Sequence, residues 1–254
     1  MEGAFNPFSL SGKTILITGA SSGIGKATAL LCSKMGARVV VTGRNQARLQ
    51  ETYKTLWGEG HQQIPADLTD GESTTSLVEN VPMLDGIVHS AGIGHRKLCK
   101  SVDRNDIAIV MEANFNSAVL LQSSLLTKRK VSKSASIVFV SSRAADIPSV
   151  ANAVYSASKA ALKSYAQCLS LELAPRNIRV NCICPAIVQT PLWEPLINDG
   201  GLTEDDLVQT KSQYPLRRFG LPEDIANLAV FLLSDASSWM TGSCIDITGG
   251  SIVL

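Results

Sequence analysis

The stretch Thr18-Gly19-Ala20-Ser21-Ser22-Gly23-Ile24-Gly25 decides the fold prediction for this chain. It lies between a short apolar run rich in β-branched residues, 14–18, and a segment with a helical pattern, 23–35. Glycines at such a junction permit a tight turn and a close approach of the backbone to a pyrophosphate, and the following helix presents free N–H groups to the phosphates. Glycine turns also occur for structural reasons alone. The position of this turn between the first expected strand and the first expected helix nevertheless predicts a dinucleotide-binding fold.

Short apolar runs alternate with helical patterns along the whole chain. Such runs are typical of strands buried on both faces, as in a parallel sheet. The alternation predicts a single-domain α/β fold of Rossmann type, a doubly wound parallel sheet of about seven strands with helices on both faces. The expected strands are 14–18, 38–42, a weak 62–66, 86–90, 136–141, 178–184 and 243–247, and the expected helices are 23–35, 46–57, 71–80, 103–128, 152–173 and 222–233.

Length and composition agree with one globular domain over residues 1–254. Of the 254 residues, 45% are hydrophobic and 18% charged, which excludes a disordered, collagenous or coiled-coil protein. The formal net charge of +1 gives no reason to expect nucleic acid or an anionic membrane as a partner. Because Glu2 stands where a signal peptide carries positive charge and the sequence has no long apolar stretch, we expect a cytoplasmic protein.

The cysteines and histidines form no pattern typical of a metal site or a disulfide framework. Six cysteines and three histidines are dispersed, without a Cys-x-x-Cys pair, so we expect no metal and reduced thiols. Cys182 and Cys184 are two residues apart, which places both on one face of a strand. There they are expected as small buried hydrophobic residues.

The segment 185–216 interrupts the alternation of strands and helices. It contains Pro191, Pro195 and Pro215, a glycine pair and an apolar cluster that includes Leu192 and Trp193. A long irregular insertion in a compact domain is usually functional, so we predict a substrate lid at about 186–216. A surface loop whose apolar residues simply pack down is the alternative.

The residues after the second expected strand bear on the choice between NAD and NADP. An NAD-binding protein of this fold places an acidic residue about 20 residues beyond the glycine turn, where it binds the ribose 2′-hydroxyl. This chain has Arg44 in that region and no acidic residue before Glu51. A guanidinium fits a 2′-phosphate, with Arg48 one helical turn away as support, so the sequence favours NADP(H). A solvated arginine at a helix start is the alternative.

Asp67 follows the third expected strand. Its carboxylate is a candidate acceptor for the adenine amino group. Capping of the next helix is the alternative, although Asp70 is better placed for that.

Tyr155 and Lys159 form a candidate proton-transfer pair. Of the four tyrosines only Tyr155 has a lysine four residues on, and these positions share one face of a helix. A nearby ammonium lowers the pKa of a phenol, and bringing it from about 10 to about 7 requires about 4 kcal/mol. Such a phenol exchanges a proton near neutral pH. Taken alone, the pair is more often an exposed helix pair.

Two further polar residues belong to the same hypothesis. Ser142 closes the fifth expected strand, and open α/β sheets bind ligands at the carboxyl ends of their strands. Its hydroxyl suits a carbonyl oxygen on which negative charge develops. Asn114 lies inside an otherwise apolar helical segment, 107–126, where asparagine is a poor helix former. A kink or bulge that carries a functional contact and a buried hydrogen-bonded amide are both compatible with it.

Together these motifs resemble the short-chain dehydrogenase/reductase family, from Leu10 to the C-terminus. The glycine turn matches the family's Thr-Gly-x-x-x-Gly-x-Gly, and the tyrosine–lysine pair matches its Tyr-x-x-x-Lys. The serine and asparagine fall where the family has its own. Asn181, Pro185 and Thr190 fall in its cofactor-contacting loop.

The resemblance implies a role for each residue. Tyr155 would be the general acid in reduction, Lys159 would also bind the nicotinamide ribose, Asn114 would hold a water in a proton relay, and Ser142 would complete the catalytic set. The Ile187 backbone and the Thr190 hydroxyl would contact the nicotinamide end of the cofactor. The expected cofactor contacts are Gly19, Ser21, Ser22, Gly23, Ile24, Gly25, Arg44, Asp67, Leu68, Ser90, Ala91, Gly92, Tyr155, Lys159, Pro185, Ile187 and Thr190.

The chain departs from the family pattern at three places. His89-Ser90 stands in place of Asn-Asn after the fourth strand, Pro185-Ala186 in place of Pro-Gly, and Asp146 in place of a small residue. The first bears on the positioning of the cofactor. We expect His89 to be a structural histidine at a strand end.

The expected function is an NADP(H)-dependent oxidoreductase that acts on a carbonyl or secondary alcohol group. The segment from Pro215 to Thr241 resembles 3-oxoacyl-carrier-protein reductases and many sugar or polyol dehydrogenases. An acyl carrier would need a basic docking patch, for which Lys128-Arg129-Lys130 with Lys133 is a candidate, although a solvated loop is the plainer interpretation. An NADPH-sensing binding protein without turnover is the alternative from another class.

The sequence says less about the substrate and the oligomeric state. Specificity is expected in the lid segment and around His95, Ile147 and Val150. The family resemblance suggests a homodimer or homotetramer that covers apolar residues on the helices expected at 103–128 and 152–173.

Overall fold

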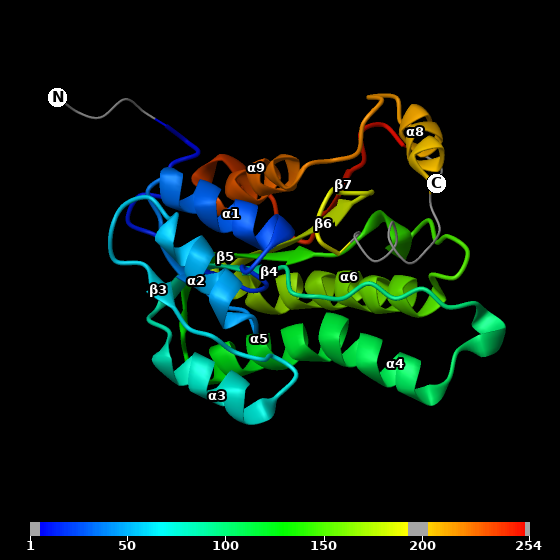
Figure 1. Ribbon diagram of the computed structural model, residues 1–254. Coiled ribbons are helices and arrows are strands. Elements are labelled where there is room, and N and C mark those ends of the chain that lie inside the picture. Colours follow the sequence, from blue (N-terminus) through cyan, green and yellow to red (C-terminus); the bar gives the residue numbers. More distant parts are fainter. Residues whose placement is uncertain (1–5, 193–202, 252–254) are drawn as a thin grey trace.

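Seven parallel strands form one sheet with the order β3-β2-β1-β4-β5-β6-β7 (Figure 1). The structure, a computed structural model, describes residues 6–192 and 203–251. Because the chain moves outward from β1 to β3 and then returns to β4, the strand order reverses between β1 and β4, where sheets of this type bind ligands. The strands are β1 (Thr14–Ile17), β2 (Arg38–Val41), β3 (Gln62–Gln63), β4 (Leu84–His89), β5 (Val131–Val140), β6 (Arg179–Pro185) and β7 (Cys244–Ile247).

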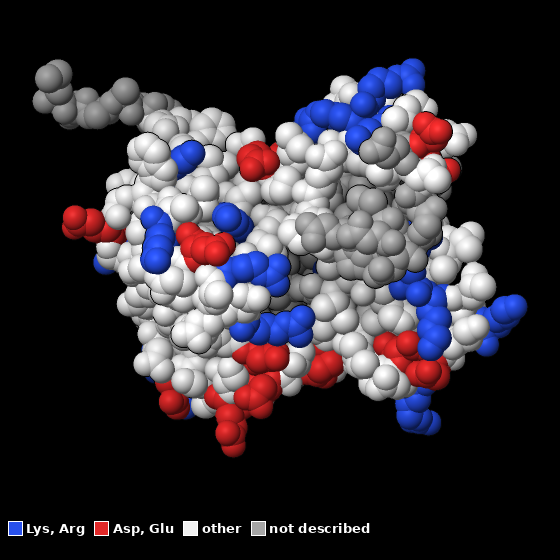
Figure 2. Space-filling model, viewed as in Figure 1, with Lys and Arg blue, Asp and Glu red and all other residues white. Residues whose placement is uncertain are grey.

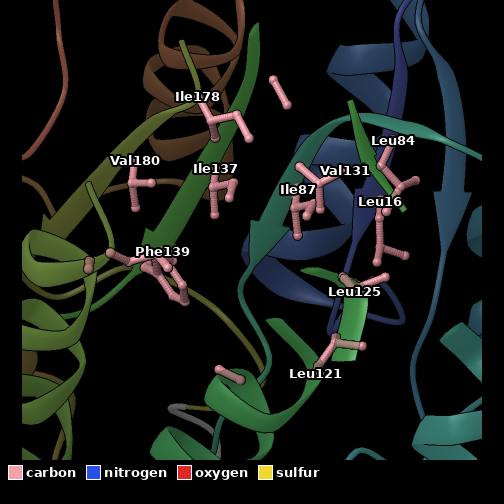
Figure 3. Packing of buried hydrophobic residues seen from close by; sticks show 14 of the residues in the cluster. Leu16, Leu84, Ile87, Leu121, Leu125, Val131, Ile137, Phe139, Ile178 and Val180 are labelled. Atoms are coloured by element: carbon pink, nitrogen blue, oxygen red, sulfur yellow. The ribbon is translucent and has the colours of Figure 1, made fainter. Parts of the chain in front are cut away.

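Helices cover both faces of the sheet, as the alternating pattern predicts (Figure 1). Side chains alternate across β1, so Ile15 and Ile17 face one apolar cluster and Leu16 faces the other. Figure 3 shows Leu121 and Leu125 beside the sheet in the second cluster. The first layer holds α1 (Gly23–Lys34), α2 (Gln46–Lys54) and α9 (Pro222–Leu233), and the second holds α3 (Gly71–Asn80), α5 (Ser117–Thr127) and α6 (Ala153–Leu173).

The prediction of a single helix over 103–128 is wrong in one respect. The structure has α4 (Arg104–Met111), then a π-helical turn at Glu112–Asn116, and then α5. The wide turn falls on the asparagine that the sequence singles out, so one of the two interpretations of Asn114, a bulge in the helix, is confirmed.

The strand expected at 136–141 begins earlier, at Val131. The basic run is divided by this boundary: Lys128, Arg129 and Lys130 form the turn before β5, as the loop interpretation expects, whereas Lys133 lies on β5. Lys130 Nζ donates to the carbonyl oxygens of Glu79 (3.1 Å) and Val81 (2.8 Å). Lys130 therefore binds carbonyls at the end of α3, where a cation is favourable.

The segment expected to be an irregular lid contains a helix, α8 (Glu204–Ser212). Thr203 and Asp206 form a capping box at its start, which explains why the helix begins there. Part of the predicted lid, 193–202, lies outside the described residues. No described helix has the length and apolar character of a membrane span.

Candidate active site

The glycine turn after β1 packs tightly against the end of β4. Gly19 has φ +65°, a conformation that favours glycine, and a Cβ there would lie 2.9 Å from the backbone of Ala91. A Cβ on Gly25 would lie 2.4 Å from the carbonyl oxygen of Gly19. Side chains at either position would separate the turn from the helix and the sheet, so both glycines are required by close backbone contact.

The turn lines a cavity of about 410 Å³ at the point where the strand order reverses. The N-terminus of α1 borders it, with no acidic residue in its first turn and, among the described residues, no side-chain cap from Ser22. Free N–H groups at a helix start bind anions, so this end of the cavity fits a pyrophosphate. Figure 2 shows a hollow near the middle of this face with basic side chains along its border.

The other end of the cavity carries charge of both signs. Arg44 and Arg48 line it, and Asp67 lies in the same wall. Hydrogen bonds from the backbone and the hydroxyl of Thr69 hold the pKa of Asp67 below its usual range, and Arg44 acts in the same direction. Asp70 caps α3 through the backbone N–H of Ser73 (2.8 Å), as expected, so Asp67 does not cap this helix.

Ser90 ties β4 to β1 at the place where the chain departs from the Asn-Asn pattern. Its hydroxyl donates to the carbonyl oxygen of Thr18 (2.5 Å), and its backbone N–H donates to Thr18 Oγ1 (3.1 Å). Ser90, Ala91 and Gly92 all line the cavity. The serine therefore keeps the two central strands joined at the cavity wall.

The π-helical turn delivers Asn114 to the loop that follows β4. Its Oδ1 accepts from the backbone N–H of Ile93 (2.7 Å), and its Nδ2 donates to Ile93 O and to Ser158 Oγ (both 3.1 Å). Ser158 in turn donates to the carbonyl oxygen of Tyr155 (2.7 Å). The bulge and the buried, hydrogen-bonded amide are thus both present, and a functional contact of Asn114 stays a prediction.

Gly92 connects the cavity with these polar groups. A Cβ on Gly92 would lie 3.0 Å from Asn114 Oδ1 and 3.4 Å from Lys159 Nζ. Lys159 is buried, and its Nζ donates to the carbonyl oxygen of Val140 (3.0 Å) at the end of β5. The lysine and the asparagine therefore lie directly behind the rim of the cavity.

Ser142 and Tyr155 complete the group from β5 and α6. Ser142 Oγ accepts from the backbone N–H of Ala144 (3.1 Å), which fixes the serine at the strand end, and its hydroxyl is hydrogen-bonded with Tyr155. Lys159 Nζ lies 5.9 Å from the centre of the Tyr155 ring, on the same side of α6. The structure thus brings together the four residues predicted as catalytic.

The expected lowering of the Tyr155 pKa by Lys159 is wrong for this structure. Burial raises the pKa of Tyr155, and the hydrogen bond with Ser142 opposes that shift only in part. Burial also lowers the pKa of Lys159 to about 8. The sequence pattern could not show that Lys159 is buried and Tyr155 partly buried. At neutral pH the phenol is therefore protonated, which is the form that donates a proton.

The loop after β4 and the loop before α6 meet beside this group. Arg96 donates to the carbonyl oxygen of Val150 (3.2 Å), and the backbone N–H of Lys97 donates to Ala151 O (2.7 Å). His95 Nε2 lies 3.1 Å from Asp106 Oδ1. Two of the three residues expected to control specificity, His95 and Val150, therefore belong to one connected rim.

One contact in the loop after β6 and one on β6 itself differ from expectation. The backbone N–H of Ile187 already donates to the Tyr214 hydroxyl (3.3 Å), and its carbonyl accepts from Gly220 N (2.9 Å). Asn181 binds Met240 O and Ser243 N, which joins β6 to the segment before β7. Thr190 does lie at the glycine turn, because a Cβ on Gly23 would be 3.1 Å from its Cγ2.

Comparisons with known proteins agree with this geometry. A family model described as Enoyl-(Acyl carrier protein) reductase matches residues 19–251. The chain is 32% identical over 245 residues to the 3-oxoacyl-[acyl-carrier-protein] reductase FabG of Rickettsia felis, covering 96% of this chain and 99% of that protein. It is 32% identical over 242 residues to Dehydrogenase/reductase SDR family member 6 of Rattus norvegicus, covering 95% of this chain and 98% of that protein. The chain belongs to the short-chain dehydrogenase/reductase family.

A solved structure supports the same assignment. A putative NAD(P)-dependent gluconate 5-dehydrogenase from Beutenbergia cavernae, solved with bound NADP, superposes with a TM-score of 0.86 at 30% identity, covering 97% of this chain and 99% of that chain. Membership makes this short-chain dehydrogenase/reductase an oxidoreductase of alcohol and carbonyl groups, in a family whose members use a nicotinamide cofactor. Within the family it resembles the 3-oxoacyl-carrier-protein reductases.

Most residues predicted to contact the cofactor line the cavity of this short-chain dehydrogenase/reductase. The exceptions are Tyr155, Lys159, Pro185 and Ile187, of which the first two lie behind Gly92. Sequence reasoning missed Thr18 and Ser158, which hold Ser90 and Asn114 in place. Ser158 stands between the tyrosine and the lysine in the sequence, but a serine on a helix gives no sign of its partner.

His89 is structural, as expected, and makes stability depend on pH. It is buried, stacks on Phe139, and its Nε2 lies 3.0 Å from Gln122 Oε1. Because that oxygen only accepts, Nδ1 is the bare nitrogen, and it has no partner among the described residues. Burial lowers the pKa of His89 to about 4. The folded protein therefore holds the neutral imidazole.

We expect the free energy of unfolding to fall by about 3 kcal/mol through His89 as the pH drops from 7 to about 4. Below about 6.5 the unfolded chain binds a proton that the folded chain does not, and the loss is complete below the folded pKa. Urea unfolding at several pH values measures the effect. His89→Asn, which carries the family's residue, removes this titration. Equal pH dependence in both proteins would contradict the assignment.

Proposed function

We propose that the chain is an NADP(H)-dependent oxidoreductase that transfers hydride between the nicotinamide and a carbonyl or secondary alcohol substrate. The observation that carries the proposal is the meeting of Asn114, Ser142, Tyr155 and Lys159 behind Gly92 at the rim of the cavity. Three segments far apart in the sequence supply these groups: the π-helical turn, the end of β5 and α6. A structural role does not require that they converge beside a cavity of this size.

Each of these residues has a distinct part in the proposed reaction. The bound nicotinamide supplies or accepts the hydride. Tyr155, protonated at neutral pH, donates its proton to the substrate oxygen in reduction. Ser142 holds that oxygen as negative charge develops on it, and Lys159 supplies positive charge beside the phenol once the proton has left. Asn114 fixes the loop after β4 and holds a water for proton exchange.

The preference for NADP(H) is proposed on the side chains at the open end of the cavity. Arg44 and Arg48 are exposed there. The stretch in which an NAD-binding protein carries an acidic residue has none before Glu51. A 2′-phosphate placed beside a guanidinium forms charge-assisted hydrogen bonds, whereas an acidic residue would repel it.

Arg44→Asp is expected to weaken NADPH binding by about 10- to 100-fold while leaving NADH binding within about threefold. The change removes one charge-assisted contact and adds a repulsive carboxylate. Titration of cofactor fluorescence measures both affinities. Arg104→Asp, the same change on α4 outside the cavity lining, is the matched control. Similar losses for NADPH and NADH would place Arg44 outside the 2′-phosphate site.

The experiment that tests the function is an oxidation screen of NADPH and NADH with ketones, β-ketoacyl thioesters and sugars. NADPH-dependent turnover of a carbonyl compound is the expected result. Faster turnover of carrier-linked than of free thioesters, lost at high salt, would identify a 3-oxoacyl-carrier-protein reductase, the activity named for several relatives. Tight NADPH binding without oxidation of any compound would instead support an NADPH-sensing protein.

We also propose a cytoplasmic homodimer or homotetramer. Ile107, Ile109, Leu120 and Leu171 are large apolar residues that are exposed on α4, α5 and α6. Association through these helices would cover them, and light scattering measures the oligomeric state. The six cysteines are free, in agreement with a reducing compartment.

A further inference from the structure

Three cysteine thiols gather at the β6–β7 edge of the sheet. Cys182 and Cys184 are successive inward positions of β6, both fully buried, and Cys244 is the in-register partner of Cys182 on β7. Cys244 packs against the same apolar cluster and is partly exposed. The three side chains therefore share one face of the sheet. We call them the thiol cluster.

The surroundings of the thiol cluster are basic. The ammonium of Lys163 interacts with Cys184 and Cys244, and Lys159 interacts with Cys182 and Cys184. The neighbouring thiols Cys182 and Cys184 hold the pKa of Cys244 below its ordinary value, while the other two thiols raise the pKa of Cys182. A negative charge in the cluster therefore falls on the one thiol that solvent reaches.

The geometry of the two strands determines which pair of thiols can form a disulfide. In-register residues on neighbouring strands have Cα atoms about 4.8 Å apart, inside the range of about 4.4–6.8 Å found for disulfides. Cys184 and Cys244 are offset by two residues, which gives about 8 Å and is too far without backbone movement. The described residues offer no group of three or more His, Cys, Asp or Glu side chains arranged for a metal ion.

We propose that Cys244 is a peroxide-reactive thiol and that Cys182 converts its oxidised form into a disulfide, which makes the thiol cluster a reversible oxidation site. This site is separate from the proposed hydride transfer. It lies partly on β6, which leads into the loop after that strand, so the disulfide would join β6 covalently to β7.

The two steps balance with a hydroperoxide as the oxidant. The Cys244 thiolate attacks the hydroperoxide, the O–O bond breaks, and a sulfenic acid forms while the peroxide is reduced to an alcohol that takes a proton from solvent. The Cys182 sulfur then attacks the Cys244 sulfur, the S–O bond breaks, and the S–S bond forms. The departing hydroxide takes the Cys182 proton and leaves as water. An external dithiol reverses the linkage.

The test treats the full chain with hydrogen peroxide, blocks remaining thiols and maps peptides by mass spectrometry. Cys244 is expected to react at least about tenfold faster than the exposed Cys99 and Cys168, because the thiolate is the reactive form. The product is expected to link the tryptic peptides 180–211 and 219–254. Because the first peptide contains both Cys182 and Cys184, fragmentation of the linked pair is used to locate the bond, which is expected at Cys182. A Cys184–Cys244 link, or reaction at Cys244 no faster than at the exposed thiols, would overturn the proposal.

Variants separate the two steps. Cys244→Ser is expected to abolish the link, and Cys182→Ala is expected to leave a sulfenic acid on Cys244 that dimedone traps. Cys168→Ser is the matched control and is expected to form the link as the parent chain does. If Cys182→Ala fails to fold, the peptide map of the parent chain still decides between Cys182 and Cys184.

Discussion

Tyr155→Phe is expected to lower kcat for carbonyl reduction by at least about 10³-fold while NADPH affinity stays within about threefold. The change removes the only atom proposed to donate a proton and keeps the ring that packs beside Lys159. Because burial raises the pKa of Tyr155, the lost group is a protonated donor at the pH of the assay. Steady-state rates with the best substrate of the screen, together with cofactor titration, measure the two effects separately.

Tyr165→Phe is the matched control for this experiment. Tyr165 lies on the same helix and packs edge-on against Phe115 and Phe139, away from Ser142. Loss of its hydroxyl is expected to change kcat by less than about threefold. If the Tyr155 variant keeps substantial turnover with an unchanged fold, another group donates the proton and the assignment is wrong.

Gly25→Ala is expected to weaken NADPH binding by at least about 100-fold. The added Cβ would lie 2.4 Å from the carbonyl oxygen of Gly19 and 2.7 Å from Ser90 Oγ, so α1 must move away from the turn. That movement takes the free N–H groups of the helix out of the cavity wall. We also expect a loss of about 1–3 kcal/mol in the free energy of unfolding, typical of overpacking at a rigid contact.

Gly71→Ala is the control for Gly25→Ala. Gly71 opens α3, and a Cβ there meets nothing within 4 Å, so neither affinity nor stability is expected to fall. Cofactor titration and thermal unfolding of both variants separate a lost phosphate site from a general loss of structure. Binding of NADPH by the Gly25 variant as tightly as by the parent chain would show that the turn does not hold the phosphates.

The sheet and the glycine turn were predictable because their patterns are local. An apolar run, a glycine at a strand end and a lysine four residues after a tyrosine are all visible in the sequence. The early start of β5 was not, because Ser132, Lys133 and Ser134 are polar. Val131 pairs with Leu84, and the register then shifts before Ser136 pairs with Gly86, so these residues extend the strand as an irregular stretch.

The details of the candidate site depend on contacts between distant segments. The sequence indicated that Asn114 was unusual, but its partners Ile93 and Ser158 belong to other elements. The direction of the Tyr155 pKa shift depends on burial by packing, which a spacing rule does not contain. The free Ile187 backbone was expected from resemblance, whereas Tyr214, 27 residues later, accepts its N–H.

The wide turn at Glu112–Asn116 makes this helix one residue longer than a regular helix over the same path. Deleting a single residue there would let α4 and α5 join as one regular helix, but Asn114 would then swing away from Ile93. The residues of α5 beyond the turn would keep their places on that path, so Leu121 and Leu125 would still face the sheet. The surplus residue thus serves the polar contact and not the apolar packing, and its loss would separate the two.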